Sequence, residues 1–110
     1  MNFKYEIYEI EFTEDCRDEI REIYRYISKK LIAKKSAKQL MQKIRKIIMN
    51  LAESPKLYPK INKYDKIKKR CFRKIVIDNY VILYTIDEQK KVIYISHMYY
   101  GGKNYLESFL

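Results

Sequence analysis

Three segments rich in β-branched and aromatic residues follow one another closely in the second half of the chain, and they constrain the fold most. Their sequences are CFRKIVI at 71–77, YVILYTI at 80–86 and KVIYISHM at 91–98. Only Asp78 and Asn79 separate the first two, and both residues tolerate positive φ in a two-residue hairpin turn. The third follows a short polar turn at residues 87–90. The pattern predicts a meander of three antiparallel strands, with the almost continuously apolar second strand at its centre.

The first half of the chain predicts one strand and two helices. Phe3–Phe12 alternates apolar and polar residues with one slip, which is typical of a strand that contains a bulge. Thr13 is a suitable N-cap for a helix over residues 14–32, where apolar residues recur at spacings of three and four. A second helix is expected to start at Ala37, after a capping box that begins at Ser36, and to end before Pro55.

These elements predict a single α+β domain over residues 1–110. Only a few residues separate the two helices, which favours an antiparallel helical hairpin. We expect this hairpin to pack on one face of a mainly antiparallel four-stranded sheet, with Pro55–Lys66 as a crossing loop. Cys16 and Cys71 are far apart in the sequence, and we expect two buried thiols in a reducing compartment rather than a disulfide or a metal site.

Positive charge is concentrated in the middle of the chain. The formal net charge is +10, and residues 23–52 contain nine bases and no acid. Residues 54–74 contain nine bases and a single acid, Asp65. Such a field favours a polyanionic partner: nucleic acid, the ribosome, an anionic membrane surface or an acidic protein. No apolar run approaches the roughly 20 residues of a membrane span, and the N-terminus does not resemble a signal peptide, so we expect a cytoplasmic protein without a membrane segment.

The candidate chemistry is basic and aromatic. The sequence has no Gly-rich phosphate loop, no CxxC and no HExxH, so we expect neither a metal nor a cofactor. Arginine binds phosphate bidentately, lysine adds positive potential, tyrosine stacks on bases, and histidine titrates near neutral pH. The candidates of these kinds that we single out are Lys66, Lys68, Lys69, Arg70, Arg73, His97, Tyr99, Tyr100 and Tyr105.

A set of this kind can cleave RNA without a metal. The ribose 2′-OH supplies the nucleophile, so the protein needs only a base, an acid and cations that stabilise the charged transition state. Arg73 and His97 occur on strands of one sheet and could meet on one face. The plainer interpretation is that His97 is structural, that the tyrosines of the strands are packing residues, and that Lys60, Lys63 and Lys66 lie on a solvated loop. Arg73, within an otherwise apolar strand, is the least easily explained by solubility.

Several motifs in a fixed order resemble a known family. They are FTEDCRDEIREIYRYISKKL, then LAESPKLYPK, then FRKIVIDNYVILYTID, and finally VIYISHMYYGGKNYLESFL. Together they span almost the whole chain and are similar to the RelE/ParE superfamily of toxins from bacterial type II toxin–antitoxin systems. The resemblance implies a growth-inhibiting toxin that a cognate antitoxin neutralises, with contact to operator DNA only through that antitoxin.

The resemblance implies one of three activities. The RelE-like branch cleaves mRNA in the ribosomal A site, which makes a ribosome-dependent, metal-independent endoribonuclease the leading expectation. The ParE-like branch poisons DNA gyrase, and this is the alternative. A third possibility is an inactive member that only binds the antitoxin. In each case the resemblance also suggests that an acidic, amphipathic antitoxin segment covers Arg73 and its neighbours.

For the ribonuclease, the residue types and the resemblance together give specific expectations. The resemblance itself points to Arg73, to Lys69 and Arg70, and to Tyr99 or Tyr100. The expected catalytic residues are Arg73, His97 and Tyr100. The expected RNA-binding residues are Lys68, Lys69, Arg70, Tyr99, Lys103 and Tyr105. The chain departs from the family pattern where many relatives have arginine at the position of His97, and where Gly102 replaces one of two basic residues.

Overall fold

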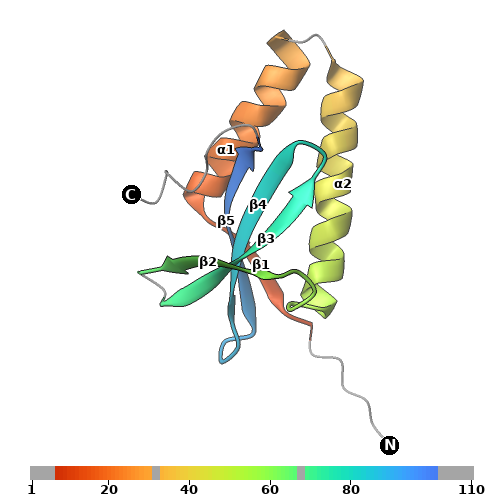
Figure 1. Ribbon diagram of the computed structural model, residues 1–110. Helices are drawn as coiled ribbons and strands as arrows, with labels where there is room; N and C mark the ends of the chain where they lie inside the picture. Colours follow the sequence, from red (N-terminus) through yellow and green to blue (C-terminus); the bar gives the residue numbers. More distant parts are fainter. Residues whose placement is uncertain (1–6, 31–32, 67–68, 102–110) are drawn as a thin grey trace, which may run out of the picture.

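The computed structural model describes residues 7–30, 33–66 and 69–101, and Figure 1 shows their arrangement. The elements in chain order are strand β1 (Glu9–Phe12), helix α1 (Glu14–Arg25), a π-helical turn (Tyr26–Lys30), helix α2 (Lys34–Glu53), and strands β2 (Lys60–Asp65), β3 (Arg70–Ile77), β4 (Tyr80–Asp87) and β5 (Val92–Tyr100). None of the helices in these ranges is long and apolar enough to cross a membrane.

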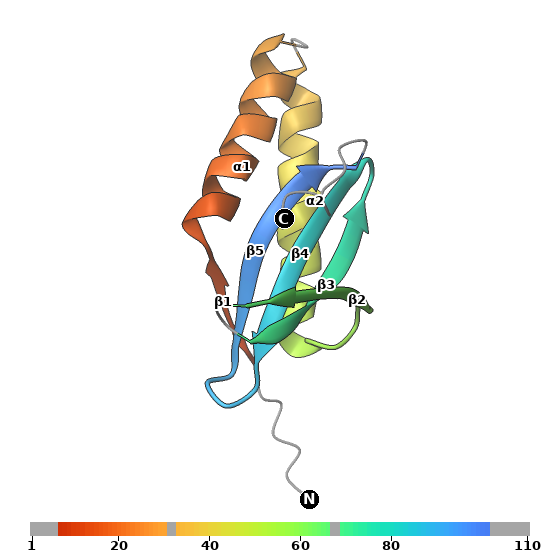
Figure 2. The same cartoon turned by 60° about the vertical axis from the view of Figure 1, so that its left-hand side comes forward.

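The strands form one sheet with the order β1-β5-β4-β3-β2. The predicted meander is confirmed, because β3 pairs antiparallel with β4 and β4 with β5. β1 runs parallel to β5, and the long connection that a parallel pair needs passes through the helical hairpin and then through β2, β3 and β4. Figure 2 shows α2 behind the sheet, with β3, β4 and β5 in front of it. The α+β class with a helical hairpin on one sheet face is therefore confirmed.

The sheet has five strands rather than the predicted four. The segment predicted as a crossing loop contains β2, which pairs antiparallel with β3 at the edge of the sheet. Its sequence KINKYD alternates between exposed and half-buried side chains. Because an edge strand needs no continuous apolar run and is commonly rich in lysine, its composition resembles that of a loop. Lys60 and Lys63 therefore lie on a strand, and their assignment to a loop was wrong.

The helix boundaries also differ from the prediction. α1 begins after Thr13 as expected, but it ends at Arg25 and a π-helical turn follows it. α2 begins at Lys34, so Ser36 lies inside the helix and not at its N-cap. The N-cap is Ala33, whose methyl side chain cannot accept a hydrogen bond. The predicted capping box is therefore wrong, because the helix begins two residues before Ser36.

Two apolar clusters lie on opposite faces of the sheet. The larger cluster joins the helices to the sheet and includes Leu51, Ile75 and Ile95, which are fully buried. The smaller cluster consists of Phe72, Val81, Leu83 and Tyr99, with Ile61 packed against it. Since neighbouring residues of a strand point to opposite faces, membership of a cluster shows which face a strand residue occupies.

An irregularity in β5 changes which side chains face the helices. Tyr84 pairs with Ile95, but the next residue of β4, Leu83, pairs with His97. Ser96 is therefore the extra residue of a β-bulge. Ile93 and Ile95 belong to the cluster under the helices, as does Met98, but His97 lies on the face of Leu83. The bulge shifts the alternation by one residue and decides the position of every side chain from His97 to Tyr100.

Candidate functional site

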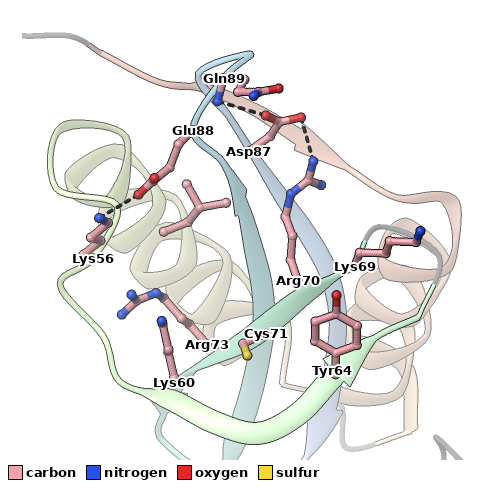
Figure 3. A pocket seen from close by; sticks show the side chains of 11 residues that line it. Lys56, Lys60, Tyr64, Lys69, Arg70, Cys71, Arg73, Asp87, Glu88 and Gln89 are labelled. Atoms are coloured by element: carbon pink, nitrogen blue, oxygen red, sulfur yellow. Dashed lines mark hydrogen bonds and ion pairs between the residues drawn. The ribbon is translucent and has the colours of Figure 1, made fainter.

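A basic hollow with a volume of about 550 Å³ lies between the β2–β3 edge and the turn that joins β4 to β5 (Figure 3). Its lining residues are Lys56, Lys60, Tyr64, Lys69, Arg70, Cys71, Arg73, Ile86, Asp87, Glu88 and Gln89. Five of these side chains are cationic and two are carboxylates. The hollow therefore gathers a part of the chain's excess positive charge into one concave place, where a polyanion can bind.

Arg73 lies on the helix-covered side of β3. It is the cross-strand partner of Tyr84, which belongs to the cluster under the helices. Its Nη1 donates a hydrogen bond of 2.6 Å to the carbonyl oxygen of Tyr58. The Tyr84 hydroxyl donates to the carbonyl of Pro55 at 2.7 Å, and burial raises the pKa of that hydroxyl to about 12. Arg73 and Tyr84 therefore fix the backbone of the segment that leads into β2.

Arg70 is held by a carboxylate within the same hollow. Its Nη2 donates to Oδ2 of Asp87 at 2.8 Å, and its guanidinium lies 5.9 Å from the centre of the Tyr94 ring. The other oxygen of Asp87 accepts hydrogen bonds from the backbone N–H groups of Gln89 and Lys90. The bond from Lys90, and after it the charge of Arg70, hold the pKa of the Asp87 carboxyl below its ordinary value. Arg70 is therefore largely neutralised where it stands.

The three lysines of the hollow differ in their surroundings. Lys56 forms an exposed ion pair of 2.6 Å with Glu88. Lys60 is the cross-strand partner of Arg73, so the two cations lie on the same face and side by side in Figure 3. Lys69 has a φ of 55° at the start of β3. The hollow has five cations and only two carboxylates, so it keeps a net positive charge to which Lys60, Lys69 and Arg73 contribute.

Sequence reasoning found part of this hollow and missed part of it. The structure brings together Lys69, Arg70 and Arg73, which were predicted to bind or act on RNA. It adds Lys56, Lys60 and Tyr64, which precede the predicted first strand of the meander. The alternation in KINKYD was the available signal for Lys60 and Tyr64, because it indicates a strand that can pair with β3.

His97 lies on the opposite face of the sheet from Arg73. It pairs with Leu83, and its ring stacks on Tyr99 with 5.3 Å between the ring centres. Its Nδ1 is 3.2 Å from Oε1 of Glu19, and the same oxygen accepts a hydrogen bond from the backbone N–H of Met98. The expectation that Arg73 and His97 share one face is wrong, because the bulge at Ser96 places His97 on the face of Leu83, opposite to that of Tyr84 and Arg73.

Tyr100 lies near the far end of the sheet. It pairs with Tyr80, whereas Arg73 pairs with Tyr84, four residues further along β4. At about 3.3 Å per residue, this offset separates the two positions by roughly 13 Å along the strand direction. Arg73, His97 and Tyr100 therefore occupy three separate places and do not form one group. Lys68, Lys103 and Tyr105 lie outside the described residues.

The remaining predictions concern metals and thiols. Among the described residues, no three side chains of the His, Cys, Asp or Glu type are grouped so that they could hold a metal ion. Both cysteines are free thiols. Cys16 is buried as predicted, but Cys71 is exposed in the basic hollow, so the prediction of two buried thiols is wrong for Cys71.

Comparison with known proteins places this fold and sequence in a family. A sequence model described as the ParE toxin of the type II toxin–antitoxin system parDE matches residues 10–105. This chain belongs to the ParE toxin family. A search of curated proteins finds no significant match. The family assignment confirms the predicted type II toxin of the RelE/ParE superfamily.

Solved structures of such toxins share the fold of this ParE-family chain. They include the chromosomal ParDE system from P. aeruginosa, at 14% identity and a TM-score of 0.64, covering 84% of this chain and 95% of that one. The isolated E. coli RelE toxin is 17% identical, with a TM-score of 0.60 and 93% of each chain covered. The toxin–antitoxin complex RelBE2 from Mycobacterium tuberculosis is 15% identical, with a TM-score of 0.59, covering 86% and 98% respectively.

Proposed function

We propose that this ParE-family toxin inhibits growth by binding DNA gyrase, and that an antitoxin neutralises it. One observation carries the choice over RNA cleavage: Arg73, His97 and Tyr100 are separated by the sheet and by its length. Metal-free cleavage requires a base, an acid and cations that touch one phosphodiester at the same time. The match to the ParE toxin family model supports the same choice.

Two assays on the purified toxin test this proposal. The first measures the supercoiling of plasmid DNA by gyrase at increasing toxin concentration. We expect supercoiling to be lost at micromolar toxin. In the second, a programmed ribosome is incubated with the toxin and the 5′ ends of the mRNA are mapped. We expect no new ends. Normal supercoiling together with new mRNA ends would overturn the proposal in favour of the ribonuclease.

The basic hollow keeps the ribonuclease as a second candidate. Lys60, Lys69 and Arg73 face one concave space, and such cations can stabilise a phosphorane without a metal. If the toxin cleaves mRNA, Arg73→Ala should lower the cleavage rate at least tenfold, whereas His97→Ala should leave it within about twofold. Equal losses in both variants would contradict cleavage in this hollow.

The hollow also supports the proposal of an acidic antitoxin segment. The positive charge of Lys60, Lys69 and Arg73 is complementary to a carboxylate-rich peptide, and such attraction weakens with salt. The affinity for the antitoxin should therefore fall as salt rises. The double variant Lys60→Gln/Lys69→Gln should flatten this dependence, whereas Lys38→Gln/Lys46→Gln, on the exposed side of α2, should not. A salt-independent affinity would contradict the proposal.

A further inference from the structure

A second hollow, which we call the aromatic hollow, lies at the other end of the sheet from the basic one. Its volume is about 690 Å³, which is within the roughly 300–1,000 Å³ of pockets that take small ligands. The residues that line it are Glu22, Ile23, Tyr26, Asn79, Tyr80 and Tyr100. They come from α1, from the π-helical turn, from the β3–β4 turn, from the start of β4 and from the end of β5. Such π-helical turns occur frequently at functional sites.

The tyrosines of this hollow are more exposed than packing residues. Tyr26 is 53% exposed and Tyr100 is 55% exposed. Tyr80 meets Tyr100 edge to face, with 5.9 Å between the ring centres and 68° between the ring planes. Three phenol rings therefore surround one open space, and at least two of them leave much of their surface uncovered. Exposed aromatic side chains that converge in this way are typical of recognition sites.

Two carboxylates lie at or beside the aromatic hollow, although the chain as a whole is strongly basic. Glu22 lines the hollow, and Asp78 lies in the β3–β4 turn next to Asn79. Burial raises the pKa of the Tyr80 hydroxyl, and the neighbouring Tyr100, Asp78 and Tyr26 raise it further. Glu22 has only an exposed contact of 3.5 Å with Arg25, and Asp78 has an exposed pair of 3.1 Å with Lys43. Exposed pairs of this kind are weak and exchange readily with other cations.

We propose that the aromatic hollow receives the guanidinium group of an arginine from a partner protein. Aromatic faces attract cations, and a nearby carboxylate adds charge complementarity. Arginine fits better than lysine, because its planar group stacks on rings while it donates hydrogen bonds to a carboxylate such as Glu22. This ParE-family toxin then has two sites of opposite preference, a basic hollow for acidic groups and an aromatic hollow for a cation.

Two short peptides test the proposal on the full chain. The probe is acetyl-Leu-Arg-Leu-amide, and its matched control carries citrulline, which has nearly the shape of arginine without its charge. Ring signals of the tyrosines are followed by NMR during titration to millimolar concentration. We expect shifts at Tyr26, Tyr80 and Tyr100 with the arginine peptide, and an affinity about tenfold lower for citrulline, as expected for a lost cation–π and ionic contact. Tyr64, in the basic hollow, should not shift.

Variants separate this site from nonspecific binding. Glu22→Gln should weaken the arginine peptide several-fold without changing the citrulline peptide, and Tyr100→Leu should abolish the tyrosine shifts. Glu14→Gln, at the start of the same helix, is the control and should bind like the wild type. Equal binding of the two peptides, or no shift at millimolar concentration, would overturn the proposal. So would self-association of the toxin that Tyr100→Leu removes, since a second copy would then occupy the hollow.

Discussion

The Thr13 hydroxyl donates a hydrogen bond of 2.9 Å to the carbonyl oxygen of Ser96, the extra residue of the bulge in β5. The same hydroxyl oxygen accepts a hydrogen bond of 3.2 Å from the backbone N–H of Cys16 and so caps α1. The backbone N–H of Thr13 donates to the carbonyl of Ile95. One residue therefore ties the start of the first helix to the point where the side chains of β5 change faces.

We expect Thr13→Ala to destabilise the protein by about 1–2 kcal/mol, because it removes a helix cap and leaves the Ser96 carbonyl without its donor. Thr13→Ser keeps the hydroxyl and should lose much less. Urea unfolding followed by circular dichroism measures the difference. If the alanine and serine variants unfold at the same urea concentration, the hydroxyl does not perform this role.

The hydrogen bond from the backbone N–H of Lys90 to Asp87, together with the charge of Arg70, makes the stability of the fold depend on pH in the acid range. The pKa of the Asp87 carboxyl is lowered in the folded protein, while in the unfolded chain it is about 3.9. The resulting stabilisation is present above pH 4 and is lost as the pH falls through the folded value. Asp87→Asn should therefore lower the urea midpoint at pH 7 and have a smaller effect at pH 3.

A surface carboxylate provides the control for this pH experiment. Asp18 lies on the exposed side of α1, where it contacts Arg21 at 3.2 Å. Exposed pairs on a helix contribute little to stability, so Asp18→Asn should change the urea midpoint only slightly at either pH. If Asp18→Asn lowers the urea midpoint at pH 7 as much as Asp87→Asn does, the effect comes from the change in net charge and not from the contacts of Asp87.

Arg73 is expected to contribute to stability as well as to binding. Its bond of 2.6 Å to the Tyr58 carbonyl joins a charged donor to a part-buried acceptor. Arg73→Met should therefore cost about 1–3 kcal/mol in urea unfolding. Lys74→Met changes the neighbouring residue of β3, which points to the other face, and should cost less. A neutral Arg73→Met variant would mean that water replaces the guanidinium at this carbonyl.

The two thiols should react very differently. Cys16 is fully buried, and burial, followed by the charge of Glu19, raises the pKa of its thiol to about 12. Cys71 is exposed in the basic hollow. At pH 8 a thiol reagent should modify one cysteine per folded chain and two in denaturant, and Cys71→Ser should remove the first reaction. Rapid reaction of both thiols in the folded chain would contradict the burial of Cys16.

The same shift in Cys16 gives a second expectation at high pH. Its pKa in the unfolded chain is about 8.5, so folding favours the neutral thiol. This stabilisation is complete below pH 8.5 and is lost as the pH rises toward the folded value of about 12. Cys16→Ala should show a smaller loss of stability between pH 8 and pH 10 than the wild type, measured by urea unfolding.

Local sequence patterns were sufficient to predict those helices and strands that bury one apolar face. The meander strands, the helical hairpin and the cap at Thr13 follow from apolar periodicity and from residues with strong turn or cap preferences. β2 was missed because this edge strand forms through its pairing with β3, which lies outside its own sequence. Its lysines also resemble those of a solvated loop. The site was predicted only in part for the same reason, since Lys56, Lys60 and Tyr64 of the basic hollow come from β2 and the segment before it.

The sequence by itself determined the α+β class, the order of most elements and the similarity to RelE/ParE toxins. It also determined that Lys69, Arg70 and Arg73 lie close together, because they are near neighbours in the chain at the start of β3. Only the tertiary structure decided that His97 and Arg73 lie on opposite faces. In a regular strand every second side chain points to the same face. His97 would then have followed Ile93 and Ile95 onto the face of Arg73. β5 has apolar side chains on both faces, so the bulge at Ser96 leaves no trace in its hydrophobic pattern and depends on partners distant in the chain.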